Sequence, residues 1–360
     1  MPRPVDGGPE RVNADPPASL RRTPAEHAAG IAEAATRIAP HVRRTPLLAT
    51  DLGPDVWLKP ECLQVTGAFK ARGAVNAVLA LREREPEVPG VITVSSGNHA
   101  QALAFAASLV GIPATVLIPT GANRRKVAAT IARGAEVITQ GVDNQNREER
   151  LRAVQAERGL ALVHPFDDWD VIHGQATATA EALADRPDTA LVVAPVGGGG
   201  LLTGACLAAR AHREATGSTV RVIGVEPAAA GDAAATLASG SLVRLDRAPA
   251  TIADGVRTPE IGARSFEVLV NQGLVDGIVT VEEDEILWAT AIAWRRTGLL
   301  IEPTGALPIA ALLGGHLPAV DGPTVLIVSG GNVDPLFVSW LTQADDGGLL
   351  ADPGWASAGA

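Results

Sequence analysis

The sequence predicts an α/β protein of two domains, in which parallel-type sheets are covered by helices. Short runs rich in valine, isoleucine and leucine recur at residues 91–94, 114–118, 191–194 and 325–328. Segments with apolar residues at helical spacing separate several of these runs. Such alternation is typical of parallel strands that are buried on both faces. The length of 360 residues is too great for one ordinary core and suits two domains.

The elements can be placed along the chain from periodicity and from helix-breaking residues. The first helix is expected to end before Pro40, because proline cannot continue it. Helices are expected at 25–39, 73–84, 100–110, 124–133 and 146–158, and further strands at 56–59, 135–138 and 220–225.

The chain is expected to divide into four parts. The start, 1–24, has no apolar stretch and is predicted to be a disordered leader rather than a secretory signal. A large domain is expected to combine 25–89 with 168–343, and a small domain to span 90–167. The end, 344–360, is predicted to be a loose tail of Asp, Gly and Ala.

Composition excludes several classes of function. The formal net charge is −10 and no block of Lys or Arg interrupts it, so we expect no nucleic acid partner. No apolar run is long enough to cross a bilayer, so no membrane partner is expected either. The two cysteines, Cys62 and Cys206, are expected to be buried small residues in a reducing cytoplasm.

Parallel sheets bind ligands beyond the carboxyl ends of their strands, so the loops after 94, 194, 225 and 328 are the places to look for a site. Ser95, Ser96, Asn98 and His99 lie between a strand and a helix. Taken alone they fit an ordinary helix cap as well as an anion cradle. Lys70 alone is more typical of a surface lysine than of an amine nucleophile.

The strongest single signal is a run of four glycines after a buried strand. Gly197, Gly198, Gly199 and Gly200 are costly in chain entropy, and a nest of backbone N–H groups around a phosphate explains them better than a turn. No Gly-Lys-Ser/Thr follows, and no acidic residue is placed for a ribose. A small phosphate-bearing cofactor therefore fits better than a nucleotide.

Four motifs in order carry a resemblance to a known family. They are FKARGA at 69–74, SSGNH at 95–99, the glycines at 197–200 and SGGN at 329–332. Together they resemble the threonine dehydratase and serine racemase family of fold type II pyridoxal phosphate (PLP) enzymes, over about residues 45–332. Supporting segments are 164–168, 251–255 and 301–304.

The resemblance implies a role for each matching residue. Lys70 would carry PLP covalently, with Phe69 beside the pyridine ring and Ser329 at its nitrogen. A neutral hydroxyl there makes the ring a weaker electron sink than an Asp would, which suits β-elimination. The remaining cofactor contacts would come from Asn98 at the 3-hydroxyl and from Gly197, Gly198, Gly199, Gly200 and Leu201 at the phosphate.

The resemblance also implies the substrate site and a cation site. Ser95, Ser96, Asn98 and His99 would bind the substrate carboxylate, and in the racemase branch the residue matching Ser96 is an acid/base. Glu226, Asp232 and the carbonyl of Ala230 would bind Mg²⁺ or Ca²⁺, since hard cations prefer oxygen ligands. The alternative is two solvated acids in a loop.

Some positions depart from the family pattern or stay open. Ala68 stands where many relatives have Ser, so one possible hydroxyl is absent. His173 and Ala176 replace the usual Ala and Gly, and His173 is expected to be a packed or surface residue. Arg147 with Glu148 resembles a racemase-branch pair but could equally belong to a solvated helix face.

We therefore expect an enzyme that dehydrates and deaminates a small β-hydroxy-amino acid, such as L-threonine or L-serine, to a 2-oxo acid and ammonia. Racemisation of serine and dehydration of 3-hydroxyaspartate are the alternatives within the same family. A cofactor-binding regulator without catalysis is disfavoured by the presence of Lys70 and Ser96. We expect a cytoplasmic homodimer whose partner is a small amino-acid substrate.

Overall fold

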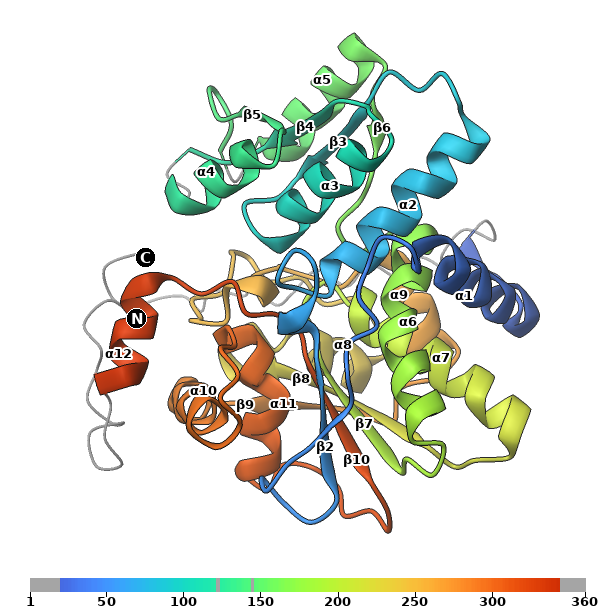
Figure 1. The fold of residues 1–360 in the computed structure, drawn as a ribbon, viewed down its shortest axis with the longest axis vertical. Coiled ribbons are helices and arrows are strands. Elements are labelled where there is room, and N and C mark those ends of the chain that lie inside the picture. Colours follow the sequence, from blue (N-terminus) through green and yellow to red (C-terminus); the bar gives the residue numbers. More distant parts are fainter. Residues whose placement is uncertain (1–19, 121–123, 144–145, 344–360) are drawn as a thin grey trace, which may run out of the picture.

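A computed structural model describes residues 20–120, 124–143 and 146–343, and the chain builds two sheets (Figure 1). The larger sheet has the strand order β1-β2-β10-β7-β8-β9 and the smaller has the order β5-β4-β3-β6. The strands are β1 (Leu48–Ala49), β2 (Val56–Pro60), β3 (Val91–Val94), β4 (Ala114–Leu117), β5 (Glu136–Ile138), β6 (Ala161–Leu162), β7 (Leu191–Pro195), β8 (Arg221–Pro227), β9 (Gly277–Val281) and β10 (Thr324–Val328).

Helices follow most of the strands, as the α/β prediction requires. They are α1 (Pro24–Ile38), α2 (Lys70–Arg84), α3 (Asn98–Leu109), α4 (Arg124–Ala132), α5 (Arg147–Arg158), α6 (Trp169–Asp185), α7 (Gly200–Thr216), α8 (Asp232–Ser239), α9 (Ala263–Phe266), α10 (Glu283–Thr297), α11 (Pro303–Leu313) and α12 (Pro335–Gln343). Short 3₁₀ turns include η2 (Glu61–Leu63) and η3 (Ala228–Ala230).

The larger sheet is buried on both faces because alternate side chains along each strand face opposite layers. Leu191 and Val193 of β7 pack with the apolar residues of α10 and α11. Val192 and Ala194 of the same strand pack with those of α6 and α7. The strands are therefore apolar at successive positions, which is why short β-branched runs predicted them.

All four strands of the smaller sheet lie within the segment 90–167 that was expected to form the small domain. Helix α2 lies between the two sheets (Figure 1). Its residues Val75, Val78 and Leu81 share a buried cluster with Leu103 of α3 and Val91 of β3. The first residue of α2 belongs to the predicted site, whereas its later turns support the small sheet.

The two ends of the chain differ in how far the structure describes them. The predicted tail 344–360 and residues 1–19 of the predicted leader lie outside the described residues, whereas residues 20–24 are among those that the structure describes. Thr23 caps α1, because its hydroxyl accepts from the N–H of Glu26 while the Glu26 carboxylate accepts from the N–H of Thr23. This capping box places the start of α1 at Pro24.

The sheets are not wholly parallel. Strand β1 pairs antiparallel with β2 at the edge of the larger sheet, whereas β2, β10, β7, β8 and β9 pair parallel. No strand was predicted from the sequence at β1, β6 or β9. The first two have only two residues each, too few to show a periodicity, whereas β9 does carry the β-branched sequence that marks a strand.

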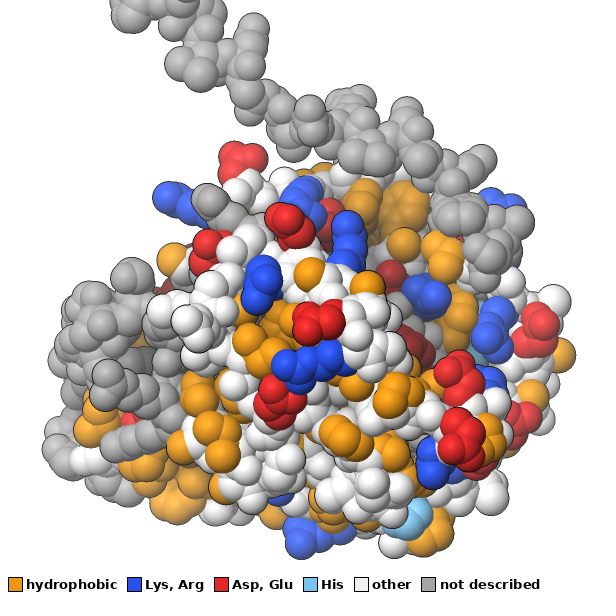
Figure 2. All heavy atoms as spheres, turned by 90° about the horizontal axis from the view of Figure 1, so that it is seen from above, with side chains coloured by type: hydrophobic (Ala, Val, Ile, Leu, Met, Phe, Trp, Pro, Cys, Tyr) orange, Lys and Arg blue, Asp and Glu red, His pale blue; other side chains and the backbone are white. Residues whose placement is uncertain are grey.

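The described surface agrees with the charge pattern of the sequence. On the face shown in Figure 2, basic and acidic side chains are interspersed. In the part of the chain that the structure describes, none of the helices has both the length and the apolar character that crossing a bilayer requires.

Candidate active site

Lys70 begins α2 at the junction of the two sheets. Its Nζ donates a hydrogen bond to the carbonyl oxygen of Pro165 at 2.7 Å and lies 5.0 Å from the centre of the Phe69 ring. Burial lowers the pKa of Lys70 to about 8, although the Glu302 carboxylate opposes this shift. The amine is therefore available in its neutral form at a much lower pH than an exposed lysine would be.

The four glycines form the turn between β7 and α7. Gly199 has a φ of 89° and offers no side chain to cap the helix. The first amide N–H groups of an α-helix have no partner within the helix, so those of α7 are not capped by a side chain. A Cβ on Gly198 would lie 2.3 Å from Cγ of Phe166, and one on Gly200 would lie 2.9 Å from the Phe166 carbonyl oxygen. Only glycine fits this close approach.

Lys70 and the glycine turn thus meet through one short segment. Pro165 accepts the hydrogen bond from Lys70, and the next residue, Phe166, packs on Gly198 and Gly200. The structure therefore brings the predicted amine and the predicted phosphate nest to the same place, although they lie far apart in the sequence.

The loop from β3 to α3 offers a second helix N-terminus. Gly97 is the N-cap and provides no side-chain cap for α3. The hydroxyl of Ser95 accepts from the Gly97 N–H at 3.3 Å, and Ser96 is exposed. Free N–H groups at the start of a helix favour an anion, which is the chemistry a substrate carboxylate needs.

His99 is placed differently from its predicted neighbours in the carboxylate site. The ring is 2% exposed, and its Nε2 lies 3.1 Å from the Val163 carbonyl oxygen. Burial, with a further effect of Lys70, lowers the pKa of His99 to about 3, so the ring is neutral. A ring that donates from Nε2 to Val163 has no second proton for a carboxylate.

Asn98, the first residue of α3, is hydrogen-bonded to Glu302 and Asn332. Its Nδ2 donates to Glu302 Oε1 at 2.8 Å, and its Oδ1 accepts from Asn332 Nδ2 at 2.9 Å. Asn332 Nδ2 also donates to the Thr66 carbonyl at 2.9 Å. Glu302 is 4% exposed. The amide of Asn98 is thereby fixed in orientation, with its second Nδ2 hydrogen left for a ligand.

Glu302 and Asn332 belong to sequence motifs that gave neither of them an individual role. Two glycines make room for them. A Cβ on Gly67 would lie 2.5 Å from Asn332 Oδ1, and one on Gly330 would lie 2.6 Å from Glu302 Oε1. The glycines of SGGN and of the segment before Lys70 were the available signal, but they do not identify the side chain that needs the space.

Ser329 follows the last residue of β10 and has a buried hydroxyl. Its backbone carbonyl accepts from the Phe69 N–H at 3.0 Å. Among the described residues, its Oγ has no hydrogen-bond partner and Ser329 is 1% exposed. A buried hydroxyl without a partner is uncommon, so a ligand atom at this point would satisfy it.

The end of β8 and the start of α8 carry a second, separate acidic cluster. Glu226 accepts from the N–H groups of Ala233 and Ala234 at 3.2 and 2.8 Å, while Oδ2 of buried Asp232 has no partner among the described residues. Burial raises the pKa of Glu226 to about 8 and that of Asp232 to about 7. The described residues include no group of three or more His, Cys, Asp or Glu side chains that could hold a metal, so any cation here would need backbone oxygens.

The residues left open by the sequence have distinct environments. His173 is 2% exposed, and its Nε2 lies 3.0 Å from His27 Nδ1, which confirms that it is packed. Arg147 starts α5, and its Nε is 4.0 Å from Glu148 Oε1. Glu148 is largely exposed. Burial lowers the pKa of His164, which is next to Pro165, and the negative charge of Glu148 opposes that shift. The pair therefore lies on a solvated face close to the site.

Comparison with known proteins identifies the family. The chain matches the family described as "Pyridoxal-phosphate dependent enzyme" over residues 38–330, and it belongs to that family. The match includes Lys70, both helix N-termini and Ser329. The family implies PLP, and the partner-free Ser329 hydroxyl and the open N–H groups of α7 fit such a group.

Curated relatives include both lyases and racemases. The chain is 42% identical to an L-threonine ammonia-lyase of Geobacter sulfurreducens, over 89% of this chain and 78% of that protein. It is 38% identical to an L-threo-3-hydroxyaspartate ammonia-lyase of Saccharomyces cerevisiae, over 88% and 97%. It is 39% identical to a serine racemase of Arabidopsis thaliana, over 84% and 92%.

A solved structure shows the same fold. The crystal structure of a threonine deaminase from T.th. superimposes with a TM-score of 0.78 and 46% sequence identity, covering 85% of this chain and 98% of that chain. The chain is therefore a fold type II PLP enzyme whose relatives eliminate from amino acids or racemise them.

Proposed function

We propose that the chain dehydrates and deaminates a small β-hydroxy-amino acid, such as L-threonine or L-serine, to a 2-oxo acid and ammonia. The observation that carries this proposal is that the Lys70 amine and the glycine turn contact adjacent residues, Pro165 and Phe166. The relatives that are ammonia-lyases support the reaction class.

The residues that would hold the cofactor are those predicted from the sequence. The N–H groups at Gly197, Gly198, Gly199, Gly200 and Leu201 would bind the phosphate, and Lys70 would form the covalent bond. Phe69 would lie beside the ring, Asn98 would donate to the 3-hydroxyl and Ser329 would contact the ring nitrogen. When bound, PLP stabilises negative charge at the substrate Cα.

The substrate would be held at the start of α3. The hydroxyls of Ser95 and Ser96 and the N–H groups at Asn98 and His99 suit its carboxylate, with His99 acting through its backbone. Once the substrate amine has replaced Lys70 on the cofactor, the freed Nζ would take the Cα proton. Its lowered pKa gives the neutral amine a larger share near physiological pH than an exposed lysine has. Departure of the β-hydroxyl as water, followed by hydrolysis, leaves the 2-oxo acid and ammonia.

The test is an assay for 2-oxo acid with a panel of β-hydroxy-amino acids, including 3-hydroxyaspartate. We expect turnover of threonine or serine by the wild type, and loss of both the visible cofactor band and turnover in Lys70→Ala. An active Lys70→Ala variant would refute the assignment of Lys70.

Serine racemisation is the second candidate, since Ser96 is exposed at the proposed substrate site and racemases are among the relatives. Chiral analysis after incubation with L-serine separates the two reactions. D-serine that forms in the wild type and not in Ser96→Ala would favour the racemase. Its absence in both, with 2-oxo acid formed, favours the lyase.

We also propose that Glu226, Asp232 and the Ala230 carbonyl bind Mg²⁺ or Ca²⁺. The support is the buried Asp232 oxygen without a partner among the described residues, beside a second buried carboxylate. Added Mg²⁺ or Ca²⁺ should raise the Tm of chelator-treated wild type but not of Asp232→Asn. An equal response of the two proteins would contradict the site.

A further inference from the structure

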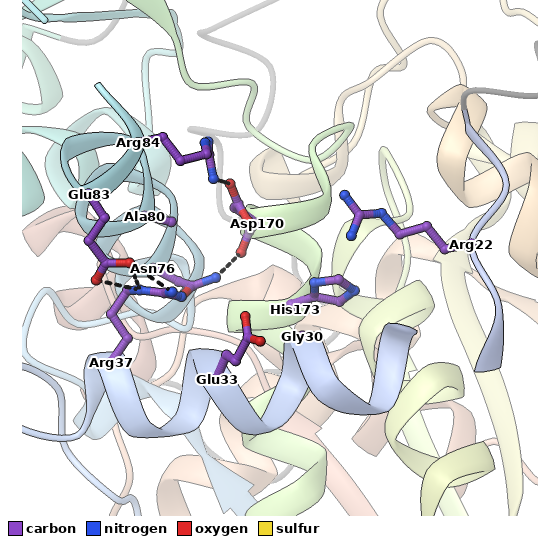
Figure 3. A pocket seen from close by; sticks show the side chains of 10 residues that line it. All are labelled: Arg22, Gly30, Glu33, Arg37, Asn76, Ala80, Glu83, Arg84, Asp170 and His173. Atoms are coloured by element: carbon purple, nitrogen blue, oxygen red, sulfur yellow. Dashed lines mark hydrogen bonds and ion pairs between the residues drawn. The ribbon is translucent and has the colours of Figure 1, made fainter. Parts of the chain in front are cut away.

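A cavity of about 230 Å³ lies among α1, α2, α6 and the segment before α1 (Figure 3). It is separate from the residues assigned above to cofactor, substrate and cation. Its walls are mainly charged, with three arginines and three carboxylates. A cavity of this size holds a small organic molecule rather than a single water.

Most of the charged groups in the wall are already paired. Arg37 Nη2 lies 3.1 Å from Glu83 Oε2, and Arg37 Nη1 donates to Asn76 Oδ1 at 2.7 Å. Arg84 Nη1 lies 2.8 Å from Asp170 Oδ2. These groups form a largely neutral wall, which favours neither a polyanion nor a metal ion.

One charge of each sign remains. Arg22 lies over the Trp169 ring at 5.9 Å, and Glu33 is exposed on α1. Among the described residues, neither Arg22 nor Glu33 has a hydrogen-bond or ion-pair partner. Figure 3 shows their charged ends directed toward the cavity from different sides.

The space between Arg22 and Glu33 is shaped by Gly30 and His173. A Cβ on Gly30 would lie 2.4 Å from His173 Nδ1, so only glycine lets the ring pack there. Burial lowers the pKa of His173 to about 4, and the imidazole is therefore neutral at physiological pH. Among the described residues, Arg22 and Glu33 are thus the two charged groups of the wall that no ion pair holds.

We propose that this cavity binds a small free amino acid, with its carboxylate on Arg22 and its ammonium group on Glu33. A ligand with one charge would leave the other residue unmatched, whereas a zwitterion satisfies both. The proposal concerns a second site and does not depend on which reaction the chain catalyses.

The helices that line the cavity reach the active site, so occupancy should alter catalysis. Helix α2 starts at Lys70, and α6 follows the segment that contains Pro165. The two helices are tied together, because Asn76 Nδ2 donates to the Asp170 carbonyl at 2.7 Å and the Gly73 N–H donates to Gln175 Oε1 at 3.2 Å. A ligand held by Arg22 and Glu33 would fill the cavity between the α1 segment and this unit.

N,N-dimethylglycine is a suitable probe. It keeps an ammonium group with one N–H and a carboxylate, but as a tertiary amine it cannot condense with the aldehyde of the cofactor. Calorimetry on the holoenzyme should show binding of this probe. Glu33→Gln and Arg22→Gln should each weaken this binding about tenfold, the loss of one charge-assisted hydrogen bond.

Glu149→Gln and Arg152→Gln are matched controls, because both residues are exposed on α5 of the small sheet's layer. They should bind the probe as the wild type does. At a concentration near its wild-type Kd, the probe should also change KM or kcat in the wild type and controls, and should change them much less in Glu33→Gln.

Several results would overturn the proposal. Binding that persists unchanged in both Glu33→Gln and Arg22→Gln places the probe elsewhere. No binding by the wild type removes the site altogether. Binding that depends on Arg22 and Glu33 without any change in KM or kcat removes its regulatory role.

Discussion

Two opposing effects determine the pKa of the Lys70 amine. Burial disfavours the ammonium form, while the Glu302 carboxylate favours it, and the result is a pKa of about 8. The same amine donates to the Pro165 carbonyl, which points it toward the segment that covers the glycine turn. A neutral amine is the form that attacks a carbonyl carbon.

This pKa predicts how cofactor-free enzyme takes up PLP. The rate of uptake, followed by the visible band, should rise about tenfold per unit as the pH approaches 8 from below, and level off above it. The sign follows because protonated Lys70 dominates below the pKa and cannot attack. A rate that continues to rise toward pH 10 would show that Lys70 behaves as an exposed lysine.

The functional role of an individual residue can be predicted from the sequence only where a motif identifies that residue. Motifs single out Lys70, Asn98 and Ser329, and the structure brings these three to one region. Glu302 orients the Asn98 amide across 204 residues of sequence, a contact that no local pattern can reveal. The packing of His27 on His173 is equally non-local.

At the scale of elements, the strands were predictable because burial on both faces demands continuous apolar runs. Val91–Val94 is found as expected, while β1 and β6 are too short to carry a pattern. The start of α2 was missed by a few residues, because Lys70 and Arg72 are polar groups at buried or partly buried positions and break the apolar periodicity.

The turn before α7 yields a prediction on cofactor affinity. Gly198→Ala would place a methyl group 2.3 Å from the Phe166 ring, so the ring and the adjoining Pro165 must move. We expect PLP to bind about tenfold more weakly, measured by titration of the cofactor-free enzyme, since both the phosphate turn and the Lys70 acceptor are displaced.

Gly53→Ala is the control for this substitution. Gly53 lies outside the site, and the nearest atom that a Cβ there would meet is the Val56 Cγ2 methyl at 3.1 Å. Gly53→Ala should lower the free energy of unfolding without changing the affinity for PLP. Equal PLP affinity in Gly198→Ala and the wild type would mean that the glycine turn is not where the phosphate binds.

At the scale of the molecule, a buried network of four charges joins β2, η2, α2 and α6. Arg72 Nε lies 2.8 Å from Glu61 Oε2, and Arg72 Nη1 lies 2.7 Å from Glu181 Oε1. Lys59 Nζ lies 2.6 Å from Glu181 Oε2. Two cations and two carboxylates balance, and Thr45 adds a hydrogen bond to Glu61 at 2.6 Å. The network fixes α2 two residues after Lys70.

Removing one charge of this buried network should reduce the free energy of unfolding far more than removing one charge of an exposed ion pair. Burial opposes the charge on Glu61, but Arg72 and Thr45 outweigh it and lower the pKa of Glu61, so the carboxylate is ionised at pH 7. Glu61→Gln leaves two buried cations facing Glu181 alone, and should reduce the free energy of unfolding by about 3 kcal/mol.

The exposed Glu136, 2.7 Å from Arg158, provides the control, with a loss below about 1 kcal/mol for Glu136→Gln. Urea unfolding of the two variants at pH 7 measures both values, and similar losses would mean that the buried network does not hold α2 against the larger sheet.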